Sequence, residues 1–412
     1  MLNFLKGRLV AVRLCLLAAA LILIGVGIAT IYSVGHPADP SPAAQTEDLS
    51  AYWKKQIMFC VVGLAGFIAV NSVNYRRFGQ ASYWIFAVVL VLLTLLLVSK
   101  YVVELPFARP RAGTYRWIWL GHGLPAMQPS EFCKLAYVMA LAWYLRYRSN
   151  YRNFKALVGP FALALLPMVL ILPEPNLGTV LLMMPILFTL LFVAGAKVKH
   201  LLIIVLMALL VSPMLWSKMR PYQRIRISSL FLQSTWVRQK AEQHSWLANV
   251  LVGAPFSESK WKSEWGWHLI RSKYAVASGG AAGYGFRRGP FVKWDFLQER
   301  HNDFIFAVIA QQWGFLGCLG VLALYVIIVS CGLEIAANNT DPFGKLLAVG
   351  IVAVFVVEVT INVSMTMGLM PITGLTLPLV SYGGSSLMAS MMSVGLLNNI
   401  GRCRPFTVAP KR

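Results

Sequence analysis

Residues 14–33 read LCLLAAALILIGVGIATIYS, an uninterrupted run without a charged side chain. A helix needs about 20 apolar residues to cross the hydrocarbon core of a bilayer. We therefore expect an all-α polytopic membrane protein of about ten transmembrane helices, in which residues 1–412 form a single transmembrane domain. Comparable apolar runs occupy residues 84–98, 157–172, 180–194, 201–215, 305–329, 346–363 and 379–400.

Composition agrees with a membrane protein and leaves a large positive charge to explain. Of the 412 residues, 58% are hydrophobic and 13% are charged, whereas soluble proteins carry about 25% charged residues. The net charge of +22 suits nucleic acid, anionic lipid headgroups or an anionic substrate. The six cysteines are scattered and form no CxxC pair, so the sequence predicts neither a zinc site nor a disulfide framework.

Short loops alternate in charge along the chain. Cytoplasmic loops of membrane proteins carry an excess of Lys and Arg. We therefore expect a multi-pass protein of the cytoplasmic (inner) membrane with both termini in the cytoplasm, which an even number of passes allows. The basic set comprises Lys6, Arg8, Arg13, Arg76, Arg77, Arg146, Arg148, Arg152, Lys155, Lys197, Lys199, Arg402, Arg404, Lys411 and Arg412, and the opposite set includes the acidic residues Asp39, Glu47, Asp48 and Glu174.

A long polar segment, about residues 217–302, separates the seventh and eighth expected helices and carries many Lys and Arg. It lies on the outer side in this topology, where long loops escape the charge rule. Outside the membrane such a segment is badly placed for nucleic acid, so we expect no nucleic-acid partner. It suits a pyrophosphate-bearing substrate, or membrane lipids through headgroup anchoring.

Four polar motifs precede the fourth, sixth, eighth and tenth expected helices. Helices of even number all begin at the outer face, so their exposed N–H groups and positive dipole ends gather there. No Walker-type loop occurs, so an enzyme at this face needs a substrate activated beforehand, such as a lipid pyrophosphate sugar. The motifs are residues 128–131 (QPSE) with Lys134, 173–179 (PEPNLGT), 299–303 (ERHND), and 371–374 (PITG) running on to 381–386 (SYGGSS).

The charged residues in these motifs each have two interpretations. Asp303 is either a carboxylate stabilised by a helix dipole or a general base that takes a proton from a sugar hydroxyl. Glu131 and Lys134 stand at i and i+3, the spacing of a structural ion pair, although charge at membrane depth also marks functional sites. Glu358 and Asn362 stand at i and i+4 and predict a polar contact between helices.

Two further segments could contact phosphate. Residues 381–386 either open the tenth helix or form a nest of backbone N–H groups for phosphate. Residues 220–226 (RPYQRIR) either place cations on a pyrophosphate leaving group or form an interfacial turn with snorkelling Arg.

In order along the whole chain, these blocks resemble the SEDS family, and its RodA branch more than its FtsW branch. The last two blocks are the most specific, and the 221–226 and 299–301 blocks favour RodA. The blocks are residues 116–118 with Leu120 and Gly121, 128–131 with Lys134, 176–179, 221–226, 266–268, 272–273, 278–280, 299–306, 368–371, 373–374, 377–378 and 381–386.

The resemblance implies a peptidoglycan glycosyltransferase that polymerises lipid II for cell elongation and shape, with undecaprenyl pyrophosphate as the leaving group. It implies Asp303 as the catalytic base and a class B penicillin-binding protein as the partner. A divalent cation, Mg or Mn, is the one cofactor considered, and the metal requirement stays open. The residues assigned to substrate binding are Arg116, Glu131, Lys134, Arg224, Arg226, Lys273, Arg300, His301, Thr376, Ser381 and Ser385.

The chain departs from the family pattern at several positions. These changes put a secondary metal or proton-handling role in doubt and leave Asp303 untouched. Asn176 stands where the family usually has Asp, Gln311 and Gln312 replace a typically acidic pair, Glu358 stands for Gln, Tyr284 stands for Lys, and residues 233–262 are longer than usual.

Two other functions therefore stay open. A flippase for the lipid-linked precursor would have polar residues near the bilayer midplane and broken helices in paired halves, and Glu358 is the one residue that favours it. A non-catalytic scaffold for a penicillin-binding protein is compatible with Asn176, Gln311 and Gln312.

Overall fold

The structure is a computed structural model. It describes residues 9–38, 50–108, 110, 114–119, 121, 126–147, 154–174, 176–294 and 300–403. Thirteen residues of the predicted loops and motifs lie outside the described residues: Lys6, Arg8, Asp39, Glu47, Asp48, Leu120, Arg148, Arg152, Pro175, Glu299, Arg404, Lys411 and Arg412.

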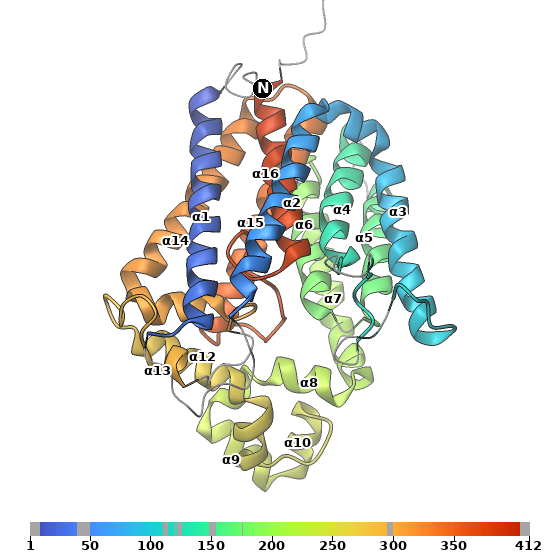
Figure 1. The fold of residues 1–412 in the computed structure, drawn as a ribbon. Helices are drawn as coiled ribbons and strands as arrows, with labels where there is room; N and C mark the ends of the chain where they lie inside the picture. Colours follow the sequence, from blue (N-terminus) through green and yellow to red (C-terminus); the bar gives the residue numbers. More distant parts are fainter. Residues whose placement is uncertain are drawn as a thin grey trace, which may run out of the picture.

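Ten helices of 14 to 33 residues form a bundle within the described ranges (Figure 1). Six of them, α1, α2, α3, α7, α14 and α15, are long and apolar enough to cross a membrane on their own, and α5 and α6 are shorter apolar helices. The predicted all-α membrane fold is confirmed. The ten are α1 (Val10–Gly35), α2 (Tyr52–Ser72), α3 (Tyr75–Tyr101), α4 (Pro129–Leu145), α5 (Val158–Ile171), α6 (Leu177–Val193), α7 (Val198–Lys218), α14 (Ile305–Ala337), α15 (Pro342–Thr366) and α16 (Gly384–Arg402).

The segment between α7 and α14 is folded into short helices at one end of the bundle, which we name the α8–α13 end (Figure 1). Apolar side chains around the buried Trp261 and Leu232 give part of this segment a small core of its own. The predicted long loop is therefore largely helical. Its helices are α8 (Pro221–Ser228), η4 (Phe231–Gln233), α9 (Thr235–Gln243), α10 (Ser245–Leu251), α11 (Glu258–Lys260), η5 (Trp261–Trp265), α12 (Trp267–Ser278) and α13 (Pro290–Lys293), and η3 (Phe154–Leu157) precedes α5.

The centre of the bundle is built from α4, α15 and α16, whose residues are buried on most sides. The apolar run expected to hold the tenth helix begins at residue 379, and α16 itself begins at Gly384, inside the segment 381–386 that was considered as its start. Leu379 is buried in a left-handed backbone conformation, φ 66°, which a β-carbon makes unfavourable inside a helix. Residues 379–381 are therefore buried without being helical, and Tyr382 and Gly383, which lead into α16, are partly buried.

Helix α14 is interrupted at Gly314, where φ is 63° and ψ is −160°. The glycine-rich segment 279–285 fills the interruption, and a β-carbon on Gly283 would lie 2.3 Å from the carbonyl oxygen of Gln312. The backbone groups released by the interruption therefore find partners in the segment. Four hydrogen bonds of 2.9 to 3.1 Å join Tyr284 N to Gln311 O, Gly285 N to Gln312 O, Phe315 N to Gly280 O and Leu316 N to Ala281 O.

Helix α7 makes little contact with the rest of the bundle. All 21 of its residues are described, and Leu201 is the one that is buried. Its other apolar side chains, such as Leu206 and Leu210, are exposed.

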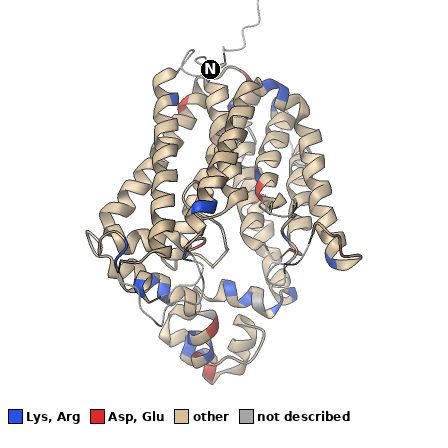
Figure 2. Cartoon of the chain, in the orientation of Figure 1, with Lys and Arg blue, Asp and Glu red and all other residues tan. Residues whose placement is uncertain are grey.

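Charged residues lie mostly at the two ends of the bundle and in the short helices of the α8–α13 end, with few between (Figure 2). The described members of the predicted basic set lie at the end where α1 begins, which we name the Val10 end. They are Arg13, Arg76, Arg77, Arg146, Lys155, Lys197, Lys199 and Arg402.

Candidate active site

Asp303 lies two residues before α14 begins, at the α8–α13 end, and its side chain is partly buried. Asn362 of α15 donates from Nδ2 to the carbonyl oxygen of Asp303 at 2.9 Å and to that of Leu375 at 2.7 Å. A β-carbon on Gly374, whose φ is 73°, would lie 3.5 Å from Asp303 Oδ2. Asp303 is thus fixed by its backbone, with its carboxylate beside the segment that connects α15 to α16.

Ser381 fastens this connecting segment to the residues before Asp303. Its hydroxyl donates to the carbonyl oxygen of Asn302 and accepts from the amide of Leu377, both at 2.8 Å. The amide of Tyr382 donates to the carbonyl oxygen of His301 at 2.9 Å. Ser381 is buried and acts here as a structural link between segments 301–303 and 377–382.

The other helix starts are joined to the same place. Ser385, at the start of α16, accepts a hydrogen bond of 2.8 Å from the backbone amide of Gln128, which precedes α4. Asn176, which precedes α6, donates to Ser130 Oγ of α4 at 3.1 Å. Thr376 and Ser386 share a hydrogen bond of 2.7 Å between their hydroxyls. The predicted convergence of the four motifs is therefore confirmed.

Arg300 and His301 precede Asp303 in sequence and are both buried. Arg300 donates to the carbonyl oxygen of Phe291 at 3.2 Å. The His301 ring stacks on Tyr52 with a centroid separation of 4.9 Å and meets Tyr382 edge-on at 5.5 Å. These contacts hold the approach to α14 in one conformation.

The remaining predicted cations lie elsewhere at this end. Lys273 of α12 is exposed and donates to Gln233 Oε1 at 2.8 Å. Arg224 of α8 donates to the carbonyl oxygens of Ser217 and Asn249, at 2.7 and 3.2 Å. It therefore holds α8 to the end of α7 and to α10, and the structure does not bring it into the Asp303 cluster. Arg226, on the same helix, is half-buried.

Arg116 lies beside Glu174, which belongs to the segment between α5 and α6. Arg116 Nε donates to the carbonyl oxygen of Glu174, and Lys100 Nζ donates to that of Pro173, both at 2.5 Å. The carboxylate of Glu174 is buried, and neither oxygen has a hydrogen-bond partner within the described part of the chain. Burial raises the pKa of Glu174 to about 8, against the opposing charges of Arg116 and Lys100.

Comparison with known proteins decides the family. A family model described as cell cycle protein, for FtsW, RodA and SpoVE, matches residues 13–404. The chain belongs to the FtsW, RodA and SpoVE family.

Individual relatives match almost the full length. The chain is 32% identical to the peptidoglycan glycosyltransferase RodA of Treponema pallidum over 93% of this chain and 96% of that protein. It is 30% identical to the stage V sporulation protein E of Bacillus subtilis over 94% and 96% of the two chains. A chain from a structure described as structural coordination of polymerization and crosslinking by a peptidoglycan synthase complex superimposes with a TM-score of 0.70, at 27% identity over 94% and 96% of the two chains.

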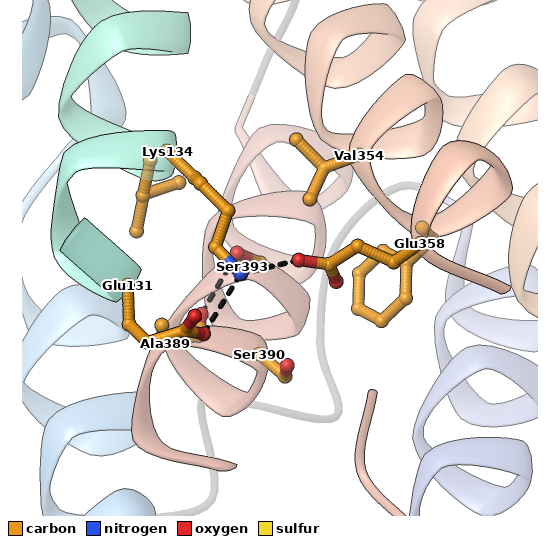
Figure 3. A pocket seen from close by; sticks show the side chains of 9 residues that line it. Glu131, Lys134, Val354, Glu358, Ala389, Ser390 and Ser393 are labelled. Atoms are coloured by element: carbon orange, nitrogen blue, oxygen red, sulfur yellow. Dashed lines mark hydrogen bonds and ion pairs between the residues drawn. The ribbon is translucent and has the colours of Figure 1, made fainter. Parts of the chain in front are cut away.

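Inside this FtsW, RodA and SpoVE fold, Lys134 of α4 lies between two carboxylates (Figure 3). Its ammonium is 2.7 Å from Glu131 Oε2 on the same helix and also pairs with Glu358 of α15. The predicted ion pair is confirmed. The predicted polar contact between helices is also confirmed for Glu358, because it reaches from α15 to Lys134 of α4. The space beside the three is about 20 Å³, which is room for one water molecule. Glu131, Lys134 and Glu358 therefore form a buried cluster of ion pairs inside the bundle. A contact of Glu131 and Lys134 with substrate stays a prediction.

Asn176, Gln311 and Gln312, at positions where the resemblance leads us to expect acids, are all buried, and two of them both donate and accept hydrogen bonds. Asn176 accepts from the amide of Thr179 at 3.4 Å, which caps α6, while it donates to Ser130. Gln312 donates to Ser33 Oγ at 2.6 Å and accepts from the amide of Arg287 at 3.1 Å. Gln311 is fully buried, and its amide atoms have no partner within the described residues. A carboxylate could not donate the hydrogen bonds that Asn176 donates to Ser130 and Gln312 donates to Ser33.

Sequence reasoning missed Gln56 of α2. Its amide donates to the carbonyl oxygen of Ser381 at 3.1 Å and accepts from the amide of Gly383 at 3.3 Å. It therefore orients the start of α16 beside the Asp303 cluster. The available signal was an uncharged polar residue directly before the apolar run 57–70 of the same helix, because buried amides in membrane helices need partners.

Proposed function

We propose that this chain is a peptidoglycan glycosyltransferase that polymerises lipid II at the α8–α13 end of the bundle. The observation that carries the proposal is the placement of Asp303. Its partly buried carboxylate lies beside Gly374, where the starts of α4, α6, α14 and α16 meet. The names of the relatives support the same chemistry.

In the proposed reaction Asp303 is the general base. The hydroxyl oxygen of the acceptor sugar attacks the anomeric carbon of the donor as the proton passes to the Asp303 carboxylate. The bond between that carbon and the pyrophosphate oxygen breaks, and undecaprenyl pyrophosphate leaves with the electron pair. The proposal also includes substrate contacts by the other predicted site residues, which are Arg116, Glu131, Lys134, Arg224, Arg226, Lys273, Arg300, His301, Thr376, Ser381 and Ser385.

A divalent cation, Mg or Mn, fits this site only as an ion shared with the substrate. No group of three His, Cys, Asp or Glu side chains lies together within the described ranges. Mg²⁺ needs only one or two protein carboxylates when phosphates supply other ligands, and Asp303 offers one. Such an ion would neutralise charge on the pyrophosphate.

The proposed location is the cytoplasmic membrane with both termini in the cytoplasm. The basic loops at the Val10 end support this orientation through the positive-inside rule. The α8–α13 end then faces outward, where lipid II is consumed and where a class B penicillin-binding protein could cross-link the product. The similarity to a synthase complex that couples polymerization and crosslinking supports such a partner, and the 32% identity to a RodA supports a role in elongation and shape.

The test is polymerisation of fluorescent lipid II by the purified full-length protein, with and without a class B partner. Asp303→Asn should abolish glycan strands, because the amide cannot take the proton. Asp341→Asn is a matched control, because Asp341 caps α15 at the Val10 end by accepting from the amide of Phe343, and Asn caps equally well.

Equal activity of Asp303→Asn and the wild type would sink the assignment of the base. If the wild type forms no strands even with its partner, the flippase or scaffold function takes precedence. A flippase would move labelled lipid II across the membrane of proteoliposomes, whereas a scaffold would not, so this measurement distinguishes the two functions.

A further inference from the structure

One face of α12 is left open at the α8–α13 end. Trp267, Ile270, Arg271 and Tyr274 are spaced i, i+3, i+4 and i+7, so they share a face of the helix. Together with Lys262 and Phe291 they line a hollow of about 420 Å³, which we name the α12 groove. The side chain of Tyr274 is 64% exposed.

The opposite face of α12 fixes the helix to the ends of the spans. Leu269, Ser272 and Ala275 are buried, and Ser272 Oγ donates to the carbonyl oxygen of Thr366, the last residue of α15, at 2.8 Å. Figure 1 shows α12 below the upright helices, beside the end of α14. The groove is therefore at the level where the membrane-spanning helices end.

The lining combines aromatic rings with positive charge. The guanidinium of Arg271 lies 3.2 Å from the ring centroid of Trp267. Lys262 is 54% exposed and also pairs with Glu258 at 2.8 Å. The six lining residues include two cations and no carboxylate. Trp and Tyr are enriched at the membrane interface, where one side of the ring is apolar and the other is wet.

We propose that the α12 groove binds the headgroup of an anionic phospholipid, such as phosphatidylglycerol. The phosphate lies against Arg271 and Lys262, and the glycerol and the first acyl carbons lie against Ile270 and Phe291. A free anion would leave the apolar half of the lining exposed to water, whereas a lipid covers both halves. This binding depends on the membrane placement of the chain and not on its catalytic activity.

The test is native mass spectrometry of the full-length protein in detergent, titrated with phosphatidylglycerol or phosphatidylcholine. Each Lys or Arg near an anionic headgroup contributes roughly a fivefold change in affinity. Arg271→Gln should therefore lower the affinity for the most tightly bound phosphatidylglycerol about fivefold and leave the affinity for phosphatidylcholine unchanged. Arg271→Lys should retain the affinity for phosphatidylglycerol. Lys260→Gln is the matched control, because it removes the same charge from a side chain that is 55% exposed and does not line the groove.

Three results of the titration would overturn the proposal. One is equal phosphatidylglycerol affinity in Arg271→Gln and the wild type, and another is a wild type that does not prefer phosphatidylglycerol to phosphatidylcholine. The third is a larger effect of Arg271→Gln on undecaprenyl pyrophosphate than on phosphatidylglycerol, which would assign the groove to the substrate. Benzoylphenylalanine at position 274 should cross-link to lipid in native membranes, and cross-linking to protein alone would assign the groove to a partner.

Discussion

Glu174 is a buried carboxyl whose neighbouring cations bind backbone carbonyls rather than its own oxygens. Its pKa is raised from 4.5 to about 8 by burial. Because the folded state binds the proton more tightly than the unfolded state, this carboxyl stabilises the fold while it is protonated. That stability is fully present below about pH 4.5 and is lost as the pH rises through about 8.

Glu174→Gln should remove this pH dependence. We expect the melting temperature of the wild type in detergent to fall between about pH 6 and about pH 9, and that of the variant to change less and to be higher at the alkaline end. Differential scanning fluorimetry across this range measures both. Parallel curves for the two proteins would show that Glu174 is charged at neutral pH in the folded state.

Residue types in motifs were predictable, but their partners were not. Asp303 and the pair Glu131 and Lys134 could be found because charge is rare in apolar surroundings. The contact of Glu358 with Lys134 joins residues 224 positions apart, and no local spacing encodes it. Ser381 and Ser385 were assigned to substrate binding, which stays a prediction. Their hydroxyls also hydrogen-bond to backbone groups of Asn302 and Gln128, 79 and 257 positions away, and no local spacing encodes these partners.

At the scale of elements, Lys134 joins α4 to α15. Removing a buried cation leaves two carboxylates without compensation, so Lys134→Met should lower the free energy of unfolding by about 3–5 kcal/mol. The triple variant Lys134→Met, Glu131→Gln, Glu358→Gln should recover most of that loss, because no buried charge remains. Denaturant titration in detergent measures both variants. A triple variant as unstable as Lys134→Met would show that packing, and not charge, dominates this contact.

The junction between segment 279–285 and the interrupted α14 gives a second prediction. A β-carbon at Gly283 would overlap the carbonyl of Gln312, whereas at Gly280, also in a left-handed conformation, it would meet nothing within 4 Å. Gly280→Ala should cost about 1–2 kcal/mol from its backbone conformation alone. Gly283→Ala should cost more and should expose the segment, so limited proteolysis should cut it faster. Equal cleavage rates in the two variants would argue against a tight junction.

Hydropathy predicted which segments form helices, but it did not predict where those helices end or are interrupted. The apolar run 305–329 predicted α14, but apolar composition does not encode the interruption at Gly314, which depends on a segment some 30 residues earlier in the chain. The region 217–302 was expected to be a loop because it is polar. Its short helices instead bury a few apolar residues, such as Trp261 and Leu232, in a small core.

For the whole molecule, the orientation in the membrane can be tested by cysteine labelling. In a variant without native cysteines, Gln239→Cys on α9 and Thr340→Cys between α14 and α15 both place an exposed thiol, at opposite ends of the bundle. An impermeant maleimide should label position 239 in intact spheroplasts and position 340 only after lysis. The reverse pattern would invert the proposed topology and move the Asp303 cluster to the cytoplasm.

The near absence of packing around α7 has an evolutionary consequence. A helix whose neighbours are lipid chains is selected for hydrophobicity rather than for shape, because lipid adapts to any apolar outline. Exchanges among Leu, Ile, Val and Met should therefore accumulate freely along residues 202–215. The same exchanges in α15, whose residues 346–353 are all buried, alter a packed core and are constrained by it. Among descendants of this chain, α7 should diverge fastest in sequence while it keeps its length and its apolar composition.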